Sequence, residues 1–216
     1  MVLKVHHLGI SQSERIVFLC EELAIPYELI LHTRAPLLAP ESLKSIPGNL
    51  TGKSPFLEDT SANVTLSESG AIAEYIIQRH GAGKLSVPPT SPNYADFLFW
   101  FHWSNATLQP QMAASMWPAS DETTGKFREA RLHAALNTMD ARLKESKWLA
   151  GEEFTVADVM PVWTLTTQRY WGPLLDLSRY PGIVRWLKDI GERPAYQRAV
   201  SILFLSERLT KADFDL

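Results

Sequence analysis

Cysteine is nearly missing from this sequence: Cys20 is the only one in 216 residues. A single cysteine excludes an intramolecular disulfide, a CxxC redox pair and a zinc site built from several thiolates. The first residues, MVLKVHHLGI, lack the continuous apolar core of a signal peptide, and no apolar run is long enough to suggest a membrane span. We therefore expect a protein of a reducing compartment, the cytoplasm.

Clustered positive charge is missing as well. The chain has 21 Lys plus Arg against 24 Asp plus Glu, a net charge of −3, with no basic block. Nucleic acids and anionic membranes bind proteins through grouped Lys and Arg side chains. We therefore exclude a nucleic acid or a membrane as the main partner, which leaves small molecules and proteins. A hydrophobic fraction of 45% allows a core without metals or disulfides.

A segment rich in Pro and Gly, GAGKLSVPPTSP at residues 81–92, divides the chain. Before it, short apolar runs alternate with helical patterns, which predicts a small α/β domain. Strands are expected at LKV near the start, Tyr27–Leu31, Pro55–Asp59 and Asn63–Leu66, and helices at Glu14–Ala24 and Glu68–Arg79. The remaining chain has the pattern of helices only. We predict a domain at 1–83, a linker at 84–92 and an all-helical domain at 93–216.

The second part contains several helical patterns. The aromatic stretch Phe97–Trp117 includes Pro110, which lacks an amide proton and should kink or break a helix. Residues Glu122–Glu145 carry apolar side chains at heptad spacing. FTVAD at Phe154–Asp158 has a threonine placed to cap the next helix. The last clear helix is expected at Ile183–Arg193.

Three features suggest chemistry but have simpler explanations. GNLTGKS at Gly48–Ser54 resembles a phosphate loop, but it is one residue too short, no strand precedes it and Pro55 follows at once. His6 and His7 are neighbours on a strand, so their side chains point to opposite faces and cannot hold one metal ion. Cys20 lies on the apolar face of a helix, which favours a buried, inert thiol. We expect no metal site.

The starts of the two helices in the α/β part are more informative. Ser11 and Ser13 precede the first helix, where backbone N–H groups and the helix dipole favour an anion. One of these hydroxyls could donate a hydrogen bond to a ligand thiolate, or could simply cap the helix. Glu68 and Ser69 open the second helix, where they could hold an ammonium and a carboxylate or act as caps.

Several motifs together resemble the cytosolic glutathione transferases, and the likeness covers nearly the whole chain. The serine with Gln after it resembles the theta-like serine type, and WSNATLQP at Trp103–Pro110 is similar to a fungal and bacterial branch. The other motifs are SQSER at Ser11–Arg15, GKSPFL at Gly52–Leu57, ESGAI at Glu68–Ile72, WLAGEEFTVAD at Trp148–Asp158, YPGIVRWL at Tyr180–Leu187 and RPA at Arg193–Ala195.

The resemblance implies a fold and a set of site residues. The fold is a thioredoxin-like domain that binds glutathione, followed by a helical bundle domain that lines the site of a small apolar electrophile. By position, Ser11 matches the serine that hydrogen-bonds the glutathione thiolate, with Ser13 as the second choice. The implied glutathione contacts are Lys53 to the glycyl carboxylate, Ser54 and cis Pro55 to the cysteinyl part, and Glu68 with Ser69 to the γ-glutamyl end. No second glycyl contact aligns within Leu37–Ile46, where Lys44 is a guess.

The resemblance also implies a reaction and an assembly. Glutathione would be the co-substrate, its thiolate would attack an apolar electrophile in detoxification, and the protein would be a homodimer. Two alternatives stay open: a glutathione-dependent peroxidase or disulfide reductase on the same fold, and a non-catalytic binding module. The sequence does not identify the electrophile or the residues that contact it.

Overall fold

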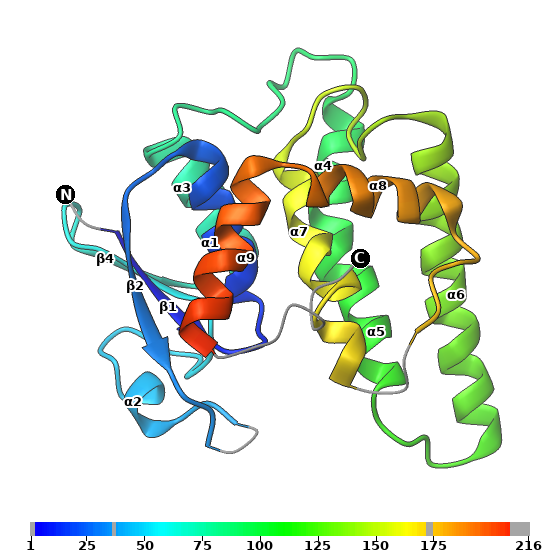
Figure 1. The fold of residues 1–216 in the computed structure, drawn as a ribbon, viewed down its shortest axis with the longest axis horizontal. Helices are drawn as coiled ribbons and strands as arrows, with labels where there is room; N and C mark the ends of the chain where they lie inside the picture. Colours follow the sequence, from blue (N-terminus) through cyan, green and yellow to red (C-terminus); the bar gives the residue numbers. More distant parts are fainter. Residues whose placement is uncertain (1–2, 36–37, 172–174, 208–216) are drawn as a thin grey trace. The chain divides into compact units, whose positions relative to one another are not determined.

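The computed structural model describes residues 3–35, 38–171 and 175–207. Its contacts divide the chain into two compact units, one of Met1–Lys84 with the segment that starts at Pro194, and one of Leu85–Arg193. The first unit contains the strands and the second is helical (Figure 1). The predicted fold class, an α/β segment of thioredoxin-like type followed by a helical one, is confirmed.

The first unit is built on a mixed sheet with the strand order β2–β1–β3–β4. The strands are β1 (Leu3–Leu8), β2 (Tyr27–His32), β3 (Phe56–Asp59) and β4 (Val64–Ser67). β1 pairs in parallel with β2 and antiparallel with β3, and β3 pairs antiparallel with β4. β1 therefore lies inside the sheet, and it extends beyond the expected LKV because His6 and His7 continue the strand although they interrupt its apolar run.

Helices pack on this sheet. The helices of the unit are α1 (Ser13–Leu23), the short α2 (Glu41–Lys44), α3 (Ser69–Arg79) and α9 (Pro194–Glu207). α1 contacts β1 and α3, α3 contacts β3 and β4, and α9 lies along α1 (Figure 1). Phe18 of α1 and Tyr196 of α9 meet edge to face with ring centroids 5.1 Å apart. β1 and β4 are both antiparallel to β3, so α1 and α3, which follow them, start at the same end of the sheet.

Helix α9 was not predicted. The sequence expectation stopped the regular structure before Pro194 and assigned all later residues to the helical domain. In the structure Pro194 is the first residue of α9, a position where its missing N–H costs nothing. The domain limits 1–83, 84–92 and 93–216 themselves stay a prediction.

The regular elements in the described residues of the second unit are all helices, apart from an isolated bridge between Trp148 and Gly151. α6 packs against α5 and α8, and α4 packs against α7. The elements are α4 (Tyr94–Trp103), η1 (Ser104–Leu108), α5 (Gln109–Ser115), α6 (Glu122–Glu145), α7 (Val156–Leu165), η2 (Gln168–Trp171) and α8 (Pro181–Gly191). The expected helix at Glu122–Glu145 is confirmed to the residue.

The interruption expected at Pro110 takes a particular form. The chain does not turn away at this proline. Instead, α4 passes into the π-helical turn η1, and Pro110 follows in the first turn of α5. A proline in the first turn of a helix has no N–H to leave unpaired. The π-turn before it contains one extra residue, which accommodates the interruption in the helical hydrogen-bond pattern.

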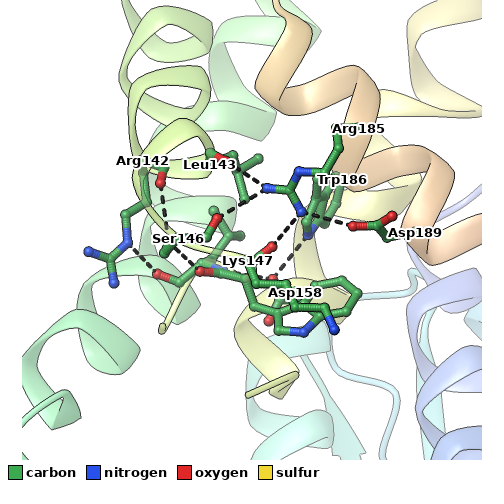
Figure 2. A network of polar contacts seen from close by, with 10 residues as sticks. Arg142, Leu143, Ser146, Lys147, Asp158, Arg185, Trp186 and Asp189 are labelled. Atoms are coloured by element: carbon green, nitrogen blue, oxygen red, sulfur yellow. Dashed lines mark hydrogen bonds and ion pairs between the residues drawn. The ribbon is translucent and has the colours of Figure 1, made fainter. Parts of the chain in front are cut away.

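A buried carboxylate connects α7 with α8 (Figure 2). Asp158 closes a capping box with Thr155, although it is shorter than the usual Glu. Its Oδ1 also accepts hydrogen bonds from the Leu149 N–H (2.9 Å) and from Nε1 of Trp186 (3.0 Å). Burial raises the pKa of Asp158 to about 6, against the lowering effect of these hydrogen bonds.

The end of α6 is held by the same region (Figure 2). Arg185 of α8 donates hydrogen bonds to the carbonyl oxygens of Leu143 (2.6 Å), Ser146 (3.1 Å) and Lys147 (2.7 Å). Leu143 belongs to the last turn of α6, whose carbonyls have no partner within the helix, and Ser146 and Lys147 follow it, so a cation is a natural cap here. Within the described ranges, no helix is both long and apolar enough to cross a membrane.

Candidate active site

The loop after β1 is the first part of the candidate site. It runs from Gly9 to Gln12 and joins β1 to α1. Arg34, which follows β2, donates hydrogen bonds to the carbonyl oxygens of Gly9 (2.6 Å) and Ile10 (2.7 Å). Ile10 has a φ of 50°, in the left-handed region that a β-branched residue seldom adopts. The contacts from Arg34 stabilise the loop in this unfavourable conformation.

Three serine side chains meet beside this loop. Ser11 Oγ lies 2.7 Å from Ser13 Oγ and 3.4 Å from Ser54 Oγ. Ser13 has no exposed surface, and its Oγ lies 2.7 Å from Nδ1 of His7. Ser11 keeps an exposed fraction of 7%. Of the two serines that the sequence left open, Ser11 is therefore the less buried one, and the fully buried Ser13 contacts it.

Helix capping explains only part of this arrangement. The N-cap residue of α1 is Gln12, and its side chain makes no capping hydrogen bond. Ser11 Oγ accepts a hydrogen bond from the backbone N–H of Ser13, but at 3.3 Å it is long. The short contacts of both hydroxyl groups are to side chains, which is unusual for residues whose role is to cap a helix.

The loop before β3 supplies the third serine. The Ser54–Pro55 peptide bond is cis, as predicted, and the Ser54 hydroxyl donates a hydrogen bond to the carbonyl oxygen of His6 at 3.0 Å. Asn49 stabilises this loop, because its Nδ2 donates hydrogen bonds to the carbonyl oxygens of Leu43 (3.0 Å) and Lys53 (3.2 Å). A phosphate loop leads into a helix, whereas this loop leads into strand β3. Its resemblance to a phosphate loop is therefore not matched by the structure.

The start of α3 is the third part of the site. Glu68 has a φ of 73° and a ψ of 114°, a conformation that L-residues rarely adopt, and it makes no side-chain cap. Ser69 is buried, and its hydroxyl donates a hydrogen bond to Oε1 of Gln12 at 3.0 Å. The starts of α1 and α3 are therefore tied together by side chains.

A buried arginine completes this connection. Nη1 of Arg15 donates hydrogen bonds to Oε1 of Gln12 and to Oγ of Ser69, both at 3.2 Å. Burial lowers the pKa of the Arg15 guanidinium to about 9, and the nearby Glu14 partly opposes this effect. At neutral pH the guanidinium is still charged, so the site contains a fixed positive charge next to the starts of α1 and α3.

Two exposed charges of opposite sign belong to the same segments. The Lys53 and Glu68 side chains are exposed, and within the residues that the structure covers neither makes a hydrogen bond or an ion pair. Lys44 is exposed as well. The segment Leu37–Ile46, in which no second glycyl contact aligns, includes Leu37, which lies outside the described residues.

The structure thus brings some of the predicted residues together directly. Ser11, Ser13 and Ser54 form one hydrogen-bonded group, and Ser69 is hydrogen-bonded to Gln12, which lies between Ser11 and Ser13 in the sequence. No contact connects Lys53 or Glu68 to this group. Ser54 and Ser69 directly follow the exposed Lys53 and Glu68 in the sequence, and an exposed ammonium together with an exposed carboxylate suits a polar ligand that carries both charges.

For Cys20, His6 and His7 the structure agrees with the simpler explanations, a buried thiol and two histidines on opposite faces of a strand. Cys20 is buried, and burial raises the pKa of its thiol to about 12, which makes it a poor nucleophile. His6 contacts His32 and Glu58, whereas His7 contacts Ser13, so the two rings do point apart. In the described part of the chain, no group of three His, Cys, Asp or Glu side chains is arranged to hold a metal ion.

Four residues near the site were not identified from the sequence alone. Gln12 and Arg15 had a signal, because they belong to the SQSER motif, but their contact with Ser69 spans more than fifty residues. Asn49 lies in a loop where an Asn usually only makes a turn. His7 was considered only as a metal ligand, and no sequence pattern indicates its contact with Ser13.

Comparison with known proteins places the chain in a family. Residues 6–84 match the family model "Glutathione S-transferase, N-terminal domain", and residues 92–194 match "Glutathione S-transferase, C-terminal domain". The chain is 29% identical to Glutathione S-transferase 3 of Schizosaccharomyces pombe over 211 residues, which cover 88% of this chain and 83% of that protein.

Two further relatives are informative. The chain is also 29% identical to Disulfide-bond oxidoreductase YfcG of Escherichia coli over 209 residues, 87% of this chain and 89% of that protein. The crystal structure of a glutathione S-transferase from Actinobacillus pleuropneumoniae matches with a TM-score of 0.83 at 25% identity, over 98% of both chains. With both family models matched in order, the chain belongs to the glutathione S-transferase superfamily.

Proposed function

We propose that the protein is a transferase that joins the glutathione thiolate to small apolar electrophiles, with a role in detoxification in the cytoplasm. The observation that carries the proposal is the Ser11 hydroxyl, which is less buried than that of Ser13 and is held by it next to the start of α1. The family membership supports glutathione as the co-substrate. A small electrophile would be the second partner.

Different residues of the first unit would bind different parts of glutathione. Glu68 would pair with the ammonium of the γ-glutamyl end, while Ser69 and the N–H groups at the start of α3 would hold its carboxylate. Lys53 would face the glycyl carboxylate. Backbone groups at Ser54, before the cis Pro55, would hydrogen-bond the cysteinyl part. The free charges of Lys53 and Glu68 fit this division, since neither is used within the described fold.

Ser11 has the chemical role. A thiol with a pKa near 8.5 is only about 3% ionised at pH 7, and lowering that pKa by two units makes the thiolate the main form, at about 2.7 kcal/mol. A hydrogen bond donated by Ser11 and the dipole of α1 together supply a stabilisation of this order. The thiol proton leaves to solvent. A carbon–sulfur bond then forms, and the leaving group departs with its electron pair.

A second candidate function rests on one comparison. A relative of equal identity is named a disulfide-bond oxidoreductase, so reduction of a peroxide or disulfide with glutathione is the alternative. Two glutathione molecules would reduce a hydroperoxide to an alcohol and water and leave as glutathione disulfide. Cys20 would take no part in this chemistry, because its thiol is buried.

One assay separates these functions. The purified protein is incubated with glutathione and, separately, an aryl halide, an isothiocyanate and a hydroperoxide, with Ser11→Ala as the matched variant. The proposal expects conjugation of at least one carbon electrophile, reduced in Ser11→Ala. Turnover of the hydroperoxide alone would support the second function. Glutathione binding without any turnover would identify a non-catalytic binding module and overturn both.

We also propose a homodimer. The exposed apolar side chains of Leu98 (37%) and Phe99 (52%) on α4 support it. α3 does not, because Ile72 and Ile76 are already buried. Light scattering at micromolar concentration should give twice the chain mass of 24.3 kDa, and a mass near 24.3 kDa would contradict the dimer.

A further inference from the structure

A line of three buried polar side chains, His7, Ser13 and Ser11, leads away from the sheet. Nδ1 of His7 lies 2.7 Å from Ser13 Oγ, and Ser13 Oγ lies 2.7 Å from Ser11 Oγ. His7 is 1% exposed and Ser13 is 0% exposed. These distances mark two short hydrogen bonds that are shielded from water. Because water cannot replace a missing partner there, it matters which atom donates in each bond.

Counting protons leaves two possible directions. Each serine hydroxyl has one proton to donate, and a neutral imidazole has one N–H. In the outward direction, His7 donates from Nδ1 to Ser13, Ser13 donates to Ser11, and the proton of Ser11 stays available to a ligand. In the inward direction, Ser11 donates to Ser13 and Ser13 donates to Nδ1 of His7. Ser11 then has no proton left for a ligand.

The contacts of Ser54 distinguish the two directions. The Ser54 hydroxyl proton is already used, because it is donated to the carbonyl oxygen of His6. Only Ser11 can therefore donate in the 3.4 Å contact between Ser11 Oγ and Ser54 Oγ. In the inward direction these two oxygens would face each other without a proton between them. The outward direction satisfies every contact, and the backbone N–H of Ser13 also points to Ser11 Oγ as an acceptor.

We propose that His7 is a positioning residue for the transferase reaction: its Nδ1–H makes Ser13 a donor to Ser11 and so turns the only proton of Ser11 toward the ligand sulfur. This inference rests on the proposed function, in which Ser11 stabilises the thiolate. The contact of Ser11 with Ser54 is long, so a sulfur anion can replace Ser54 as the acceptor at little cost. His7 itself stays buried and touches no ligand.

The test compares two substitutions of nearly equal size. The amide nitrogen of His7→Asn lies about where Nδ1 lies and can donate to Ser13, whereas His7→Leu has no donor. The readout is the pKa of the thiol of bound glutathione, followed by the ultraviolet absorbance of the thiolate against pH. For His7→Leu we expect the thiol ionisation constant and kcat to fall about tenfold, the size of one hydrogen bond to a charged group. His7→Asn should restore both to within about threefold of the unsubstituted protein.

Glutathione affinity, measured by calorimetry, provides the control. His7→Leu should leave it almost unchanged, because Lys53, Glu68 and Ser69 are intact. A bound thiol whose pKa is normal in the unsubstituted protein, or unaffected by Ser11→Ala, would refute the proposed function. A lowered thiol pKa that depends on Ser11 but is the same in His7→Leu would refute the role of His7 alone.

A second measurement needs no variant and is independent of folding defects. The nitrogen chemical shifts of a neutral imidazole distinguish its two tautomers, so ¹⁵N NMR of the intact protein reports which nitrogen of His7 carries the proton. We expect a proton on Nδ1. An unprotonated Nδ1 would impose the inward direction and overturn the inference.

Discussion

Asp158→Ala should strongly destabilise the helical unit. The carboxylate accepts hydrogen bonds from three N–H donors, the backbone N–H groups of Leu149 and Thr155 and the indole N–H of Trp186, at 2.9, 3.1 and 3.0 Å. All three donors are buried, and each costs about 1–2 kcal/mol when it loses its partner without access to water. The expected loss in the free energy of unfolding is therefore about 3–6 kcal/mol, well above the effect of a lost helix cap alone.

Asp158→Asn should cost less, by an amount that depends on pH. The amide oxygen can keep the hydrogen bonds from Leu149 and Trp186, but the amide nitrogen faces the Thr155 N–H, so about 1–3 kcal/mol is lost. Because the folded pKa of Asp158 is raised from 3.8 to about 6, its contribution to stability is largest below pH 4 and declines as pH rises through 6. The difference between the parent protein and Asp158→Asn should therefore shrink from pH 4 to pH 7.

Urea unfolding of both variants at several pH values measures these differences. Asp189→Asn is the matched control, because it removes only the partly exposed ion pair with Arg185 and should cost no more than about 0.5 kcal/mol. A loss below about 1 kcal/mol for Asp158→Ala would refute the reasoning from buried donors. A difference for Asp158→Asn that grows with pH would refute the assigned direction of the pKa.

Three further predictions concern the first unit. Glu68→Gln should weaken glutathione binding about 5- to 30-fold in calorimetry without changing the free energy of unfolding, since the side chain has no partner in the described fold; equal affinity would remove it from the site. The pKa of Asp59 is held well below its usual range by hydrogen bonds from Ser61, Tyr75 and His80, so the stability that it contributes should be lost as pH falls below about 4. Asp59→Asn should flatten acid unfolding, and an unchanged acid profile would contradict this. Cys20→Ala should keep full transferase activity, and a thiol reagent should label Cys20 only in denaturant; rapid labelling of the folded protein would be incompatible with its burial.

Local sequence patterns were sufficient for much of the fold. Periodicity predicted α6 from Glu122 to Glu145, because a long stripe of apolar residues leaves few alternatives. It missed α9 because Pro194 was interpreted as the end of the preceding helix, whereas a proline also suits the first turn of the next one. The buried residues Ala195, Ala199 and Leu203 of α9 do have helical spacing, so the signal was present.

The site was predictable as separate parts but not as an arrangement. Helix starts and motifs pointed to Ser11, Ser54 and Ser69 one by one. That Ser11 keeps a small exposed surface while Ser13 has none depends on how β1 lies between β2 and β3, which local sequence does not encode. The connections through His7 and Arg15 likewise form only once the strands have paired and the two helices have packed on them.

The central claim, that Ser11 stabilises the glutathione thiolate, is tested most directly by steady-state kinetics of Ser11→Ala and Ser13→Ala with the same electrophile. The account predicts that Ser11→Ala lowers kcat about 10- to 100-fold, the loss of a hydrogen bond to a charged group, and changes KM for glutathione much less. Ser13→Ala should have a smaller effect, about tenfold as for His7→Leu, because the proton of Ser11 is retained and only its direction is freed. A severe loss in Ser13→Ala together with unchanged kinetics in Ser11→Ala would contradict the account.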